Sequence, residues 1–343
     1  MVNSTGSSRE VLPWHSLQRE RLISQFRSGK VPHAFLFSGL EGLGKSQFAS
    51  FLASFMLCEN SKTQQVPCGE CKQCRLFESE SHPDFKLLEP EEGSASIKVD
   101  QVRQLVEFFG KSSQQGGLKI ALVSPAEALN NNAANALLKT LEEPSGQSVI
   151  ILVSHQPGML LPTIRSRCQL VDFTRPELNV SLTWLKANSI NEAGQNVPSD
   201  EDLEEVLSLA YYSPLKAMYY IQLGALKEYQ RMLDEMGTFL KNETLSSTLA
   251  TRWNDDLAHL RVAWMAHWLE LILKIKLDSV DNEKILAQKM LKYLAEKASH
   301  AELFDLYSRC LAQYRLFLGT TNPNKILAFE SLLHKWSILM RKG

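Results

Sequence analysis

The order of apolar and polar positions divides the chain into two parts. Through about residue 175, short β-rich runs alternate with helical patterns, which is typical of a mainly parallel sheet covered by helices. The strand-like runs are apolar throughout, as expected when helices bury both faces of a sheet. The pattern predicts strands at Ala34–Ser38, Phe85–Glu89, Lys119–Ser124, Val149–Ser154 and Gln169–Phe173, and helices at Lys45–Leu57, Val99–Gly110 and Asn130–Glu143.

After Pro176 the pattern becomes helical. Apolar residues recur at three- and four-residue spacing, with breaks between the segments. The expected helical segments are Glu177–Asn188, Ser199–Ala210, Leu257–Leu277 and Glu330–Met340, and the expected breaks are the polar loop Asn188–Pro198 and the stretches Asn242–Thr251, Asp278–Asn282 and Gly319–Pro323. The sequence therefore predicts an α/β domain over 11–175, a small helical domain over 176–223 and a larger helical domain over 224–343.

A glycine-rich run follows the first expected strand. Residues Gly39-Leu40-Glu41-Gly42-Leu43-Gly44-Lys45-Ser46 match G-x-x-x-x-G-K-[ST] between a strand and a helix, the context that this motif requires. Gly39, Gly42 and Gly44 let backbone N–H groups turn toward phosphates. Lys45 is expected to reach the β- and γ-phosphates, and Ser46 to bind Mg²⁺. The run predicts a site for ATP or ADP with Mg²⁺, and the alternative is a chance glycine-rich turn.

Hydrolysis of ATP needs a second strand that ends in acidic residues, which hold Mg²⁺ and orient the attacking water. The expected strand Lys119–Val123 runs instead into Ser124-Pro125-Ala126-Glu127. Ser124 and Pro125 occupy the positions of the two acids, and Glu127 comes too late unless the loop is rearranged. The isolated chain is therefore expected to hydrolyse ATP poorly or not at all.

Four cysteines follow the glycine-rich helix at the spacing C-x9-C-x2-C-x2-C, namely Cys58, Cys68, Cys71 and Cys74. This spacing can place four thiolates around one Zn²⁺. A disulfide pair is disfavoured by a reducing compartment, and a redox Cys-x-x-Cys by the shared middle cysteine. We expect a closed, structural zinc site in an insert at 58–74. Cys168 and Cys310 stand alone and are expected to be small buried residues.

Charge and hydropathy narrow the class of protein. The chain has 37 basic and 38 acidic residues, a net charge of −1, with no long basic stretch. A protein that holds nucleic acid by itself usually concentrates positive charge, so any work on DNA is expected within an assembly. No apolar run is long enough to span a bilayer. Residues 1–10 are polar and Ser-rich, unlike a signal peptide, so we expect a disordered lead-in and a cytoplasmic location.

Two arginines follow the expected strand Val149–Ser154, in the run Pro162-Thr163-Ile164-Arg165-Ser166-Arg167-Cys168. On a short helical turn at the rim of the sheet, they could form surface salt bridges. Alternatively, one could be an arginine finger, whose planar fork stabilises the γ-phosphate bound by a neighbouring subunit. The two residues alone do not decide between these roles.

The motifs in combination resemble those of bacterial clamp-loader subunits of the AAA+ superfamily. The resemblance rests on the phosphate loop, the cysteine insert, Asn135-Ala136-Leu137-Leu138-Lys139-Thr140-Leu141-Glu142-Glu143-Pro144 and Ser166-Arg167-Cys168. It extends from about Leu12-Pro13-Trp14 to Asn322-Pro323-Asn324-Lys325-Ile326-Leu327 near the end. It implies a P-loop AAA+ domain with a parallel sheet, a small helical lid domain and a C-terminal helical collar domain.

The resemblance also implies roles for single residues. Arg167 would be the catalytic arginine finger, acting in trans on an adjacent ATPase subunit, and the four cysteines match the zinc ligands of the family. Motor subunits have Asp-Glu where this chain has Ser124-Pro125, and Gly-Ser-Leu-Arg where it has Ser213-Pro214-Leu215-Lys216. These departures indicate a non-hydrolysing member, while the intact phosphate loop leaves nucleotide binding open.

The expected function is therefore that of a non-hydrolysing subunit of the DNA polymerase III clamp loader, a component of a DNA-directed DNA polymerase holoenzyme (a nucleotidyltransferase). The implied partners are ATPase subunits of the gamma/tau type, the delta subunit and, through the complex, the sliding clamp and primed DNA. One alternative is a self-sufficient clamp-loader ATPase motor, against which Ser124-Pro125 argues. Another is a zinc-dependent DNA-binding module with a scaffold P-loop, against which the near-neutral charge argues.

Overall fold

The computed structural model describes residues 11–189, 198–277, 289–319 and 323–341, which form two compact units that divide after Tyr220. The lead-in expected at 1–10, most of the polar loop expected after Asn188, and the break expected at Asp278–Asn282 lie outside the described residues.

The first unit is built on a five-stranded parallel sheet with the strand order β2-β3-β4-β1-β5. Its strands are β1 (Ala34–Ser38), β2 (Phe85–Leu88), β3 (Lys119–Val123), β4 (Ser148–Ser154) and β5 (Gln169–Asp172). This confirms the α/β class and all five predicted strands. The expectation that apolar strands are buried on both faces holds for the three central strands, which are buried along their length. It is wrong for β2 and β5, which are partly exposed because an edge strand is covered on fewer sides.

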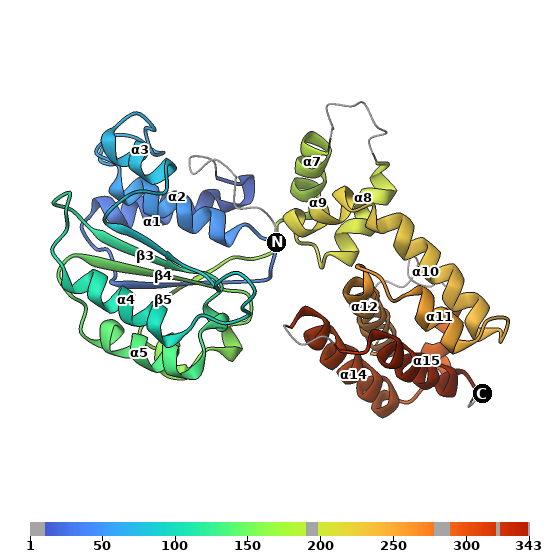
Figure 1. Ribbon diagram of the computed structural model, residues 1–343. Coiled ribbons are helices and arrows are strands. Elements are labelled where there is room, and N and C mark those ends of the chain that lie inside the picture. Colours follow the sequence, from blue (N-terminus) through green and yellow to red (C-terminus); the bar gives the residue numbers. More distant parts are fainter. Residues whose placement is uncertain (1–10, 190–197, 278–288, 320–322, 342–343) are drawn as a thin grey trace. The chain divides into compact units, whose positions relative to one another are not determined.

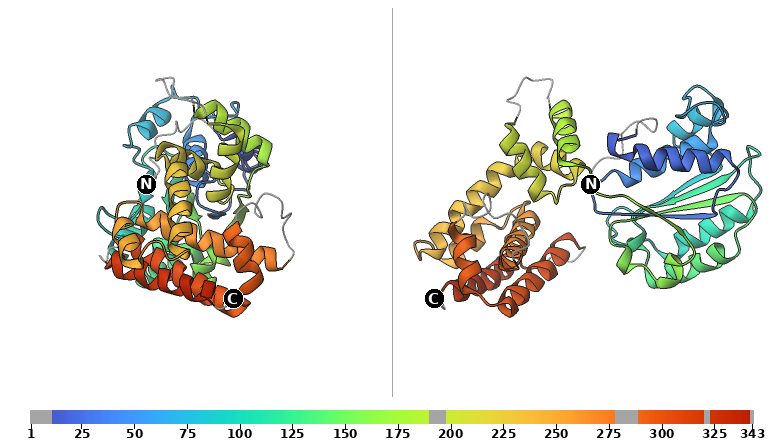
Figure 2. Two further views of the ribbon diagram at one scale, coloured as in Figure 1. Left: turned by 90° about the vertical axis from the view of Figure 1, so that its right-hand side faces the viewer. Right: turned by 180° about the vertical axis from the view of Figure 1, so that it is seen from behind.

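Helices cover both faces of this sheet (Figures 1 and 2). On one face lie α1 (Ser16–Arg27), α2 (Lys45–Leu57) and α3 (Lys72–Glu78), and on the other α4 (Val99–Gly110) and α5 (Asn131–Glu142). The first layer buries a cluster rich in phenylalanine, including Phe35, Phe37 and Phe48. The second layer buries smaller aliphatic residues, such as Leu137 and Ile150. Successive strand residues supply opposite layers, as a pleated strand requires.

Short elements complete the first unit. They are the one-turn helices η1 (Pro13–His15), η2 (Ala126–Ala128) and η3 (Pro157–Met159), and the helices α6 (Pro162–Arg165), α7 (Leu178–Asn188), α8 (Asp200–Leu209) and α9 (Pro214–Gln222), the last of which crosses the unit boundary. The side chain of Asn130 accepts a hydrogen bond from the N–H of Ala133, so it caps the N-terminus of α5.

The second unit is helical, with α10 (Ala225–Leu240), α11 (Ser246–Arg252), α12 (Ala258–Lys276), α13 (Lys289–Lys297), α14 (His300–Leu318) and α15 (Lys325–Arg341) among its described residues. Four tryptophans, Trp253, Trp264, Trp268 and Trp336, are almost completely buried in it. The break expected at Asn242–Thr251 is wrong in part, because α11 occupies most of it. Its Ser- and Thr-rich sequence has low helix propensity, so the burial of Leu249 and Ala250 is what stabilises this helix.

Candidate functional site: the phosphate loop, the cysteine cluster and Arg167

The phosphate loop joins β1 to α2, as the sequence predicts. Gly44 immediately precedes α2 with φ +86°, a conformation that favours glycine. A Cβ atom at Gly44 would lie 2.2 Å from Cδ1 of Leu12, and one at Gly39 would lie 2.3 Å from the carbonyl oxygen of Phe173. The loop is therefore packed on two sides by its own unit, and side chains at these glycines would displace it.

Lys45 lies inside the loop and is only 2% exposed. Its Nζ donates hydrogen bonds to the carbonyl oxygens of Gly39 at 2.7 Å and Leu40 at 2.6 Å. Burial lowers the pKa of Lys45 from 10.5 to about 8, although the nearby carboxylates of Glu127 and Glu41 favour the charged form. The ammonium group thus uses loop carbonyls as partners and would exchange them for phosphate oxygens in a nucleotide complex.

Ser46, the expected Mg²⁺ ligand, has a hydroxyl partner from another strand. Its Oγ lies 3.0 Å from Oγ of Ser124, which directly follows β3. Ser124 therefore stands where an acidic residue would have to stand in order to share a metal ion with Ser46. A neutral hydroxyl at this place offers no negative charge to a divalent cation.

Glu127 does not fill the place of the missing acid. It lies in the one-turn helix η2, beyond the end of β3. Its Oε1 accepts a hydrogen bond of 2.8 Å from the backbone N–H of His155, just after β4. The carboxylate is thereby tied to the end of β4, and its described hydrogen bond is with this amide rather than with Ser46.

The start of α9 also contacts the phosphate loop. The N–H of Leu215 donates a 3.1 Å hydrogen bond to the carbonyl oxygen of Gly42, and a Cβ at Gly42 would lie 2.7 Å from Cβ of Lys216. From the N-terminal part of the unit, Nε1 of Trp14 donates a hydrogen bond of 3.0 Å to the carbonyl oxygen of Leu43, which is also in the loop. Burial lowers the pKa of Lys216. Lys216, where motor subunits of the resembled family have arginine, is thus a half-buried lysine beside the loop.

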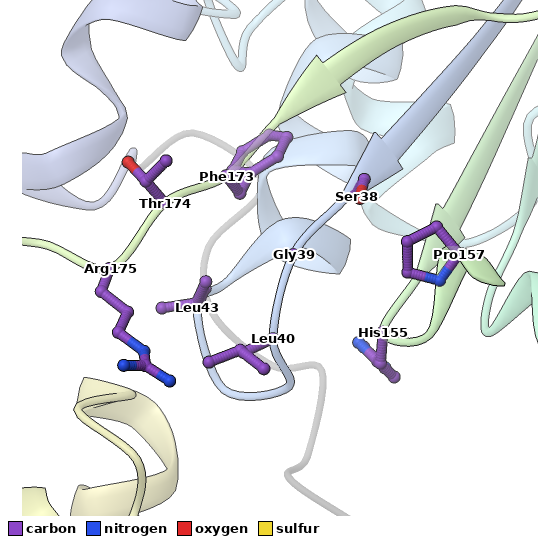
Figure 3. A pocket seen from close by; sticks show the side chains of 9 residues that line it. All are labelled: Ser38, Gly39, Leu40, Leu43, His155, Pro157, Phe173, Thr174 and Arg175. Carbon is purple, nitrogen blue, oxygen red and sulfur yellow. The ribbon is translucent and has the colours of Figure 1, made fainter. Parts of the chain in front are cut away.

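A pocket of about 530 Å³ opens beside the loop (Figure 3). Arg175 and His155 lie on opposite sides of the loop residue Leu40 in this view. Burial lowers the pKa of His155, and the positive charge of Lys45 lowers it further, so its imidazole is neutral near pH 7. The sequence reasoning missed His155. The available signal was a polar residue directly after a buried parallel strand, where such sheets place ligand-binding groups.

The four cysteines predicted to bind zinc come together at the far end of α2. Their four sulfur atoms lie within 4.8 Å of one another, and Sγ of Cys68 is 3.9 Å from Sγ of Cys74. Tetrahedral coordination with Zn–S bonds of about 2.3 Å requires S···S separations of roughly 3.8 Å. Backbone N–H groups of Cys68, Cys71 and Cys74 each donate to the preceding cysteine sulfur at 3.4 Å. The cluster can hold a metal ion, and all four thiols are unpaired by disulfides.

A hydrogen-bond network joins the cysteine insert to the sheet. Asp84, which is 1% exposed, precedes β2, and its carboxylate accepts bonds from Ser113 Oγ and from the N–H groups of Gln114 and Gln115 at 2.8 to 2.9 Å. The side chain of Gln115 in turn accepts a 3.3 Å bond from Gln73 Nε2, in α3 of the insert. These bonds lower the pKa of Asp84 despite its burial. The insert is therefore fixed to the edge of the sheet.

Gln73 has a second partner, His82, whose ring completes this network. Nδ1 of His82 accepts from the N–H of Asp84 at 3.1 Å, and its Nε2 lies 2.9 Å from Oε1 of Gln73. Because Nδ1 accepts, the proton of the neutral ring is on Nε2 and is donated to Gln73. The sequence pattern did not predict α3 or this network, because both depend on residues distant in the chain.

Arg167 lies two residues beyond α6. Its Nη2 is 2.7 Å from Oε1 of Glu142, the last residue of α5, and its Nη1 donates to the carbonyl oxygen of Thr163 at 2.9 Å. The side chain of Arg167 is 34% exposed. The described contacts of its side chain lie at α5 and α6, apart from the phosphate loop and the cysteines. Cys310 is fully buried, as expected for a lone cysteine, whereas Cys168 is only partly buried against the apolar layer of α5.

Comparison with known proteins assigns the family. DNA polymerase III subunit delta' of Pseudomonas aeruginosa is 38% identical to this chain over 337 residues, which cover 97% of the chain and 99% of that relative. The chain belongs to the DNA polymerase III subunit delta' family. The delta' subunit of Escherichia coli is 29% identical over 96% of each chain. Family models described as DNA polymerase III, delta subunit, and as its C terminal part match residues 14–177 and 224–337.

Solved structures give a weaker likeness. A DNA polymerase III gamma subunit-related protein from Thermotoga maritima aligns with a TM-score of 0.44 and 18% identity, covering 94% of this delta' family member and 100% of that chain. The Bacillus subtilis DNA clamp loader delta protein aligns with a TM-score of 0.33 and 12% identity, covering 93% and 99%. Among the described helices, none is both long and apolar enough to cross a membrane.

Proposed function

We propose that this delta' family member is a non-hydrolysing subunit of the DNA polymerase III clamp loader, and that it acts in DNA replication beside subunits that do hydrolyse ATP. One observation carries this proposal. A complete phosphate loop lies next to a strand end where Ser46 meets the hydroxyl of Ser124 in place of a carboxylate. Without that carboxylate, a bound nucleotide would lack both a firm metal ligand and an oriented water.

The proposed contribution to catalysis is Arg167, acting as an arginine finger at the ATP site of a neighbouring ATPase subunit of the gamma/tau type. The chemistry of the arginine side chain supports this role. A guanidinium group keeps its charge and offers two parallel N–H donors to phosphate. Arg167 follows a short helix at the rim of the sheet, and part of its side chain is exposed. The Ser166-Arg167-Cys168 motif is the sequence feature that singles out this arginine over Arg165.

Two cofactors belong to the proposal. The residues Gly39, Gly42, Gly44, Lys45 and Ser46 would hold ATP or ADP, with Mg²⁺, and Cys58, Cys68, Cys71 and Cys74 would hold one structural Zn²⁺. Support for zinc comes from the sulfur spacing and from the N–H groups directed at the sulfurs. Support for nucleotide comes from Lys45, whose ammonium group already lies within the loop.

The proposed assembly uses the three domains predicted from the sequence. Residues 11–175 would be the AAA+ domain, 176–223 a lid and 224–343 a collar that joins the subunits. The delta subunit would be a further neighbour, and the sliding clamp and primed DNA would be reached through the complex. The proposed role implies a cytoplasmic location.

ATP turnover tests the proposal directly. The purified chain should show no turnover above that of a Lys45→Ala preparation, whereas a complex reconstituted with gamma/tau-type and delta subunits should hydrolyse ATP when primed DNA and clamp are added. Arg167→Ala should reduce this DNA-stimulated rate. A finger contributes on the order of 10³–10⁵ at a single site in other P-loop systems, and the loss should be smaller where several sites contribute.

Arg165→Ala is the matched control, because it removes an exposed arginine two residues earlier, at the end of α6, and leaves Arg167 in place. Turnover by the pure chain at the rate of a motor subunit would support the self-sufficient ATPase instead. Salt-sensitive binding of DNA by the isolated chain would support the DNA-binding module.

A further inference from the structure

The backbone around Arg167 is fixed to α5. Ile164 of α6 is 1% exposed and packs in the same apolar cluster as Leu137 and Leu141 of α5. The N–H of Arg167 donates to the carbonyl oxygen of Ile164 at 3.1 Å, which continues the turn of α6. The position from which the Arg167 side chain starts is therefore set by the packing of two helices.

The guanidinium group is held at two of its three nitrogens. Nη2 pairs with Oε1 of Glu142 at 2.7 Å. Nη1 donates to the carbonyl oxygen of Thr163 at 2.9 Å and lies 3.4 Å from Oγ of Ser166. Two contacts from different helices fix the plane of the guanidinium as well as its position. The remaining N–H donors of the fork are left for another ligand.

The exposure of the pair bears on its role. The side chains of Arg167 and Glu142 are 34% and 49% exposed, and an ion pair this open to water contributes little to folding stability. Because the ion pair is weak, a polyphosphate with several negative charges can displace the Glu142 carboxylate. Glu142 is therefore poorly suited to keeping Arg167 from binding a phosphate ligand. A long arginine side chain has many rotamers, however, and restricting them in advance lowers the cost of placing its donors.

We infer that Glu142 is a positioning residue that pre-orients the Arg167 guanidinium for the neighbouring subunit, an inference that rests on the proposed finger role of Arg167. Glu142 acts through Arg167 and does not itself reach the neighbouring nucleotide. It affects the step in which transition-state charge is stabilised, so the turnover number should depend on it while the KM for ATP does not.

The test uses the reconstituted complex with gamma/tau-type and delta subunits, primed DNA and clamp. Glu142→Ala should lower the DNA-stimulated kcat by about two- to fivefold at unchanged KM for ATP, the scale of a partly exposed ion pair. Glu142→Gln keeps a carbonyl oxygen as acceptor and should retain most of the rate. Glu143→Ala is the matched control, because it removes the exposed carboxylate of the next residue, which is not the partner of Arg167. Assembly of each variant is checked by size-exclusion chromatography.

A double-mutant cycle decides the inference. In an Arg167→Ala background, Glu142→Ala should have no further effect. An equal loss in both backgrounds overturns the inference, because Glu142 would then act independently of Arg167, and a rise in kcat with Glu142→Ala overturns it because the carboxylate would then be restraining the finger. If Arg167→Ala itself leaves kcat unchanged, the finger proposal fails. If Arg167→Ala lowers kcat and Glu142→Ala does not, only the positioning role fails.

Discussion

The hydroxyl oxygens of Ser46 and Ser124 lie 3.0 Å apart, across the gap between the start of α2 and the end of β3. The residue that this loop would offer to Mg²⁺ is thus paired with a neutral group that has no charge to attract the ion. The half of the site proposed to bind phosphate and the half that would bind metal are separable in this chain, since the loop is complete and the strand end is not. Single substitutions can therefore address each half in turn.

Replacement of Ser124 by aspartate should restore the metal-binding half. We expect Ser124→Asp to raise the affinity for ATP in Mg²⁺, relative to EDTA, by roughly tenfold, which corresponds to about 1.4 kcal/mol. The added carboxylate is a ligand that Mg²⁺ prefers. Turnover should stay absent, because Pro125 offers no group to orient a water. Titrations with a fluorescent nucleotide measure the effect, and Ser124→Asn, similar in size but uncharged, is the control. The same Mg²⁺ dependence in both variants would contradict the assignment of Ser124 to the metal position.

Nucleotide affinity should depend on pH through Lys45. Its pKa in the free protein is lowered to about 8, and a bound polyphosphate favours the charged form. At pH 7 the proton is already present, whereas above pH 8 binding has to take one up. The affinity for Mg²⁺-free ADP should therefore fall as pH rises above about 8, by up to roughly tenfold per unit. Calorimetric titrations at pH 7 and 9.5 measure this, and Lys45→Met should bind weakly without such a slope. A slope equal to that of the variant would rule out Lys45 as the group responsible.

The contact between Gly42 and α9 predicts a graded effect of two glycine substitutions. Gly42 and Gly146 have φ angles of +79° and +57°, so an alanine is strained at both. A Cβ at Gly42 would also lie 2.7 Å from Cβ of Lys216, whereas one at Gly146 meets nothing within 4 Å. Gly42→Ala should therefore destabilise the first unit by about 1–3 kcal/mol more than Gly146→Ala. Hydrogen exchange of the α9 amides measures the difference, and equal protection in the two variants would refute the packing.

The cysteine cluster predicts a metal content and a local effect of its loss. Elemental analysis should find one zinc ion per chain in protein purified without chelator, and the same in Cys168→Ala. Cys71→Ser should lose the ion and increase hydrogen exchange over residues 58–78, because the insert has few apolar residues of its own, while β1 and β4 stay protected by their buried core. A chain without zinc, or a variant in which the whole sheet loses protection, would refute this description of the site.

The burial of His15 predicts that the folded protein loses stability in acid. It is buried against Phe48 and Phe173, with ring centroids 5.4 and 4.9 Å away, and burial lowers its pKa from 6.5 to about 4. Between these values the unfolded chain binds more protons than the folded one, so stability should fall as pH drops from 6.5 to about 4. The contribution is about 3 kcal/mol. His15→Gln should reduce this slope for the β1 amides in hydrogen exchange, whereas the exposed His300→Gln should not. An unchanged slope in His15→Gln would assign the acid sensitivity to other groups.

Local sequence patterns were sufficient for most of the first unit. Strand and helix bounds there follow from runs such as Ala34–Ser38 and from caps such as Asn130, and these features act over a few residues. The predictions failed where a distant contact decides the structure. The helix at Ser246–Arg252 is stabilised by burial rather than propensity, and the exposure of β2 and β5 follows from their place at the edges of the sheet.

The candidate site divides in the same way. The motifs are enough to predict roles for Lys45, Ser46 and the four cysteines, because each motif lies within a short stretch of chain. The sequence could not show that Lys45 is bonded to Gly39 and Leu40, that Glu127 is tied to His155, or that Arg167 is paired with Glu142. Each of these contacts depends on how loops meet in three dimensions, and in the last two the partners lie 25 or more residues apart in the sequence.

Asp84 fixes the orientation of the cysteine insert relative to the sheet. Its carboxylate accepts hydrogen bonds from the backbone of Gln114 and Gln115, and the side chain of Gln115 accepts one from Gln73 beside the four clustered cysteines. Three stretches of chain therefore share one set of hydrogen bonds. An insert held by these hydrogen bonds does not move freely relative to the sheet. The insert and the edge strand β2 would therefore present one rigid surface to any protein that bound there.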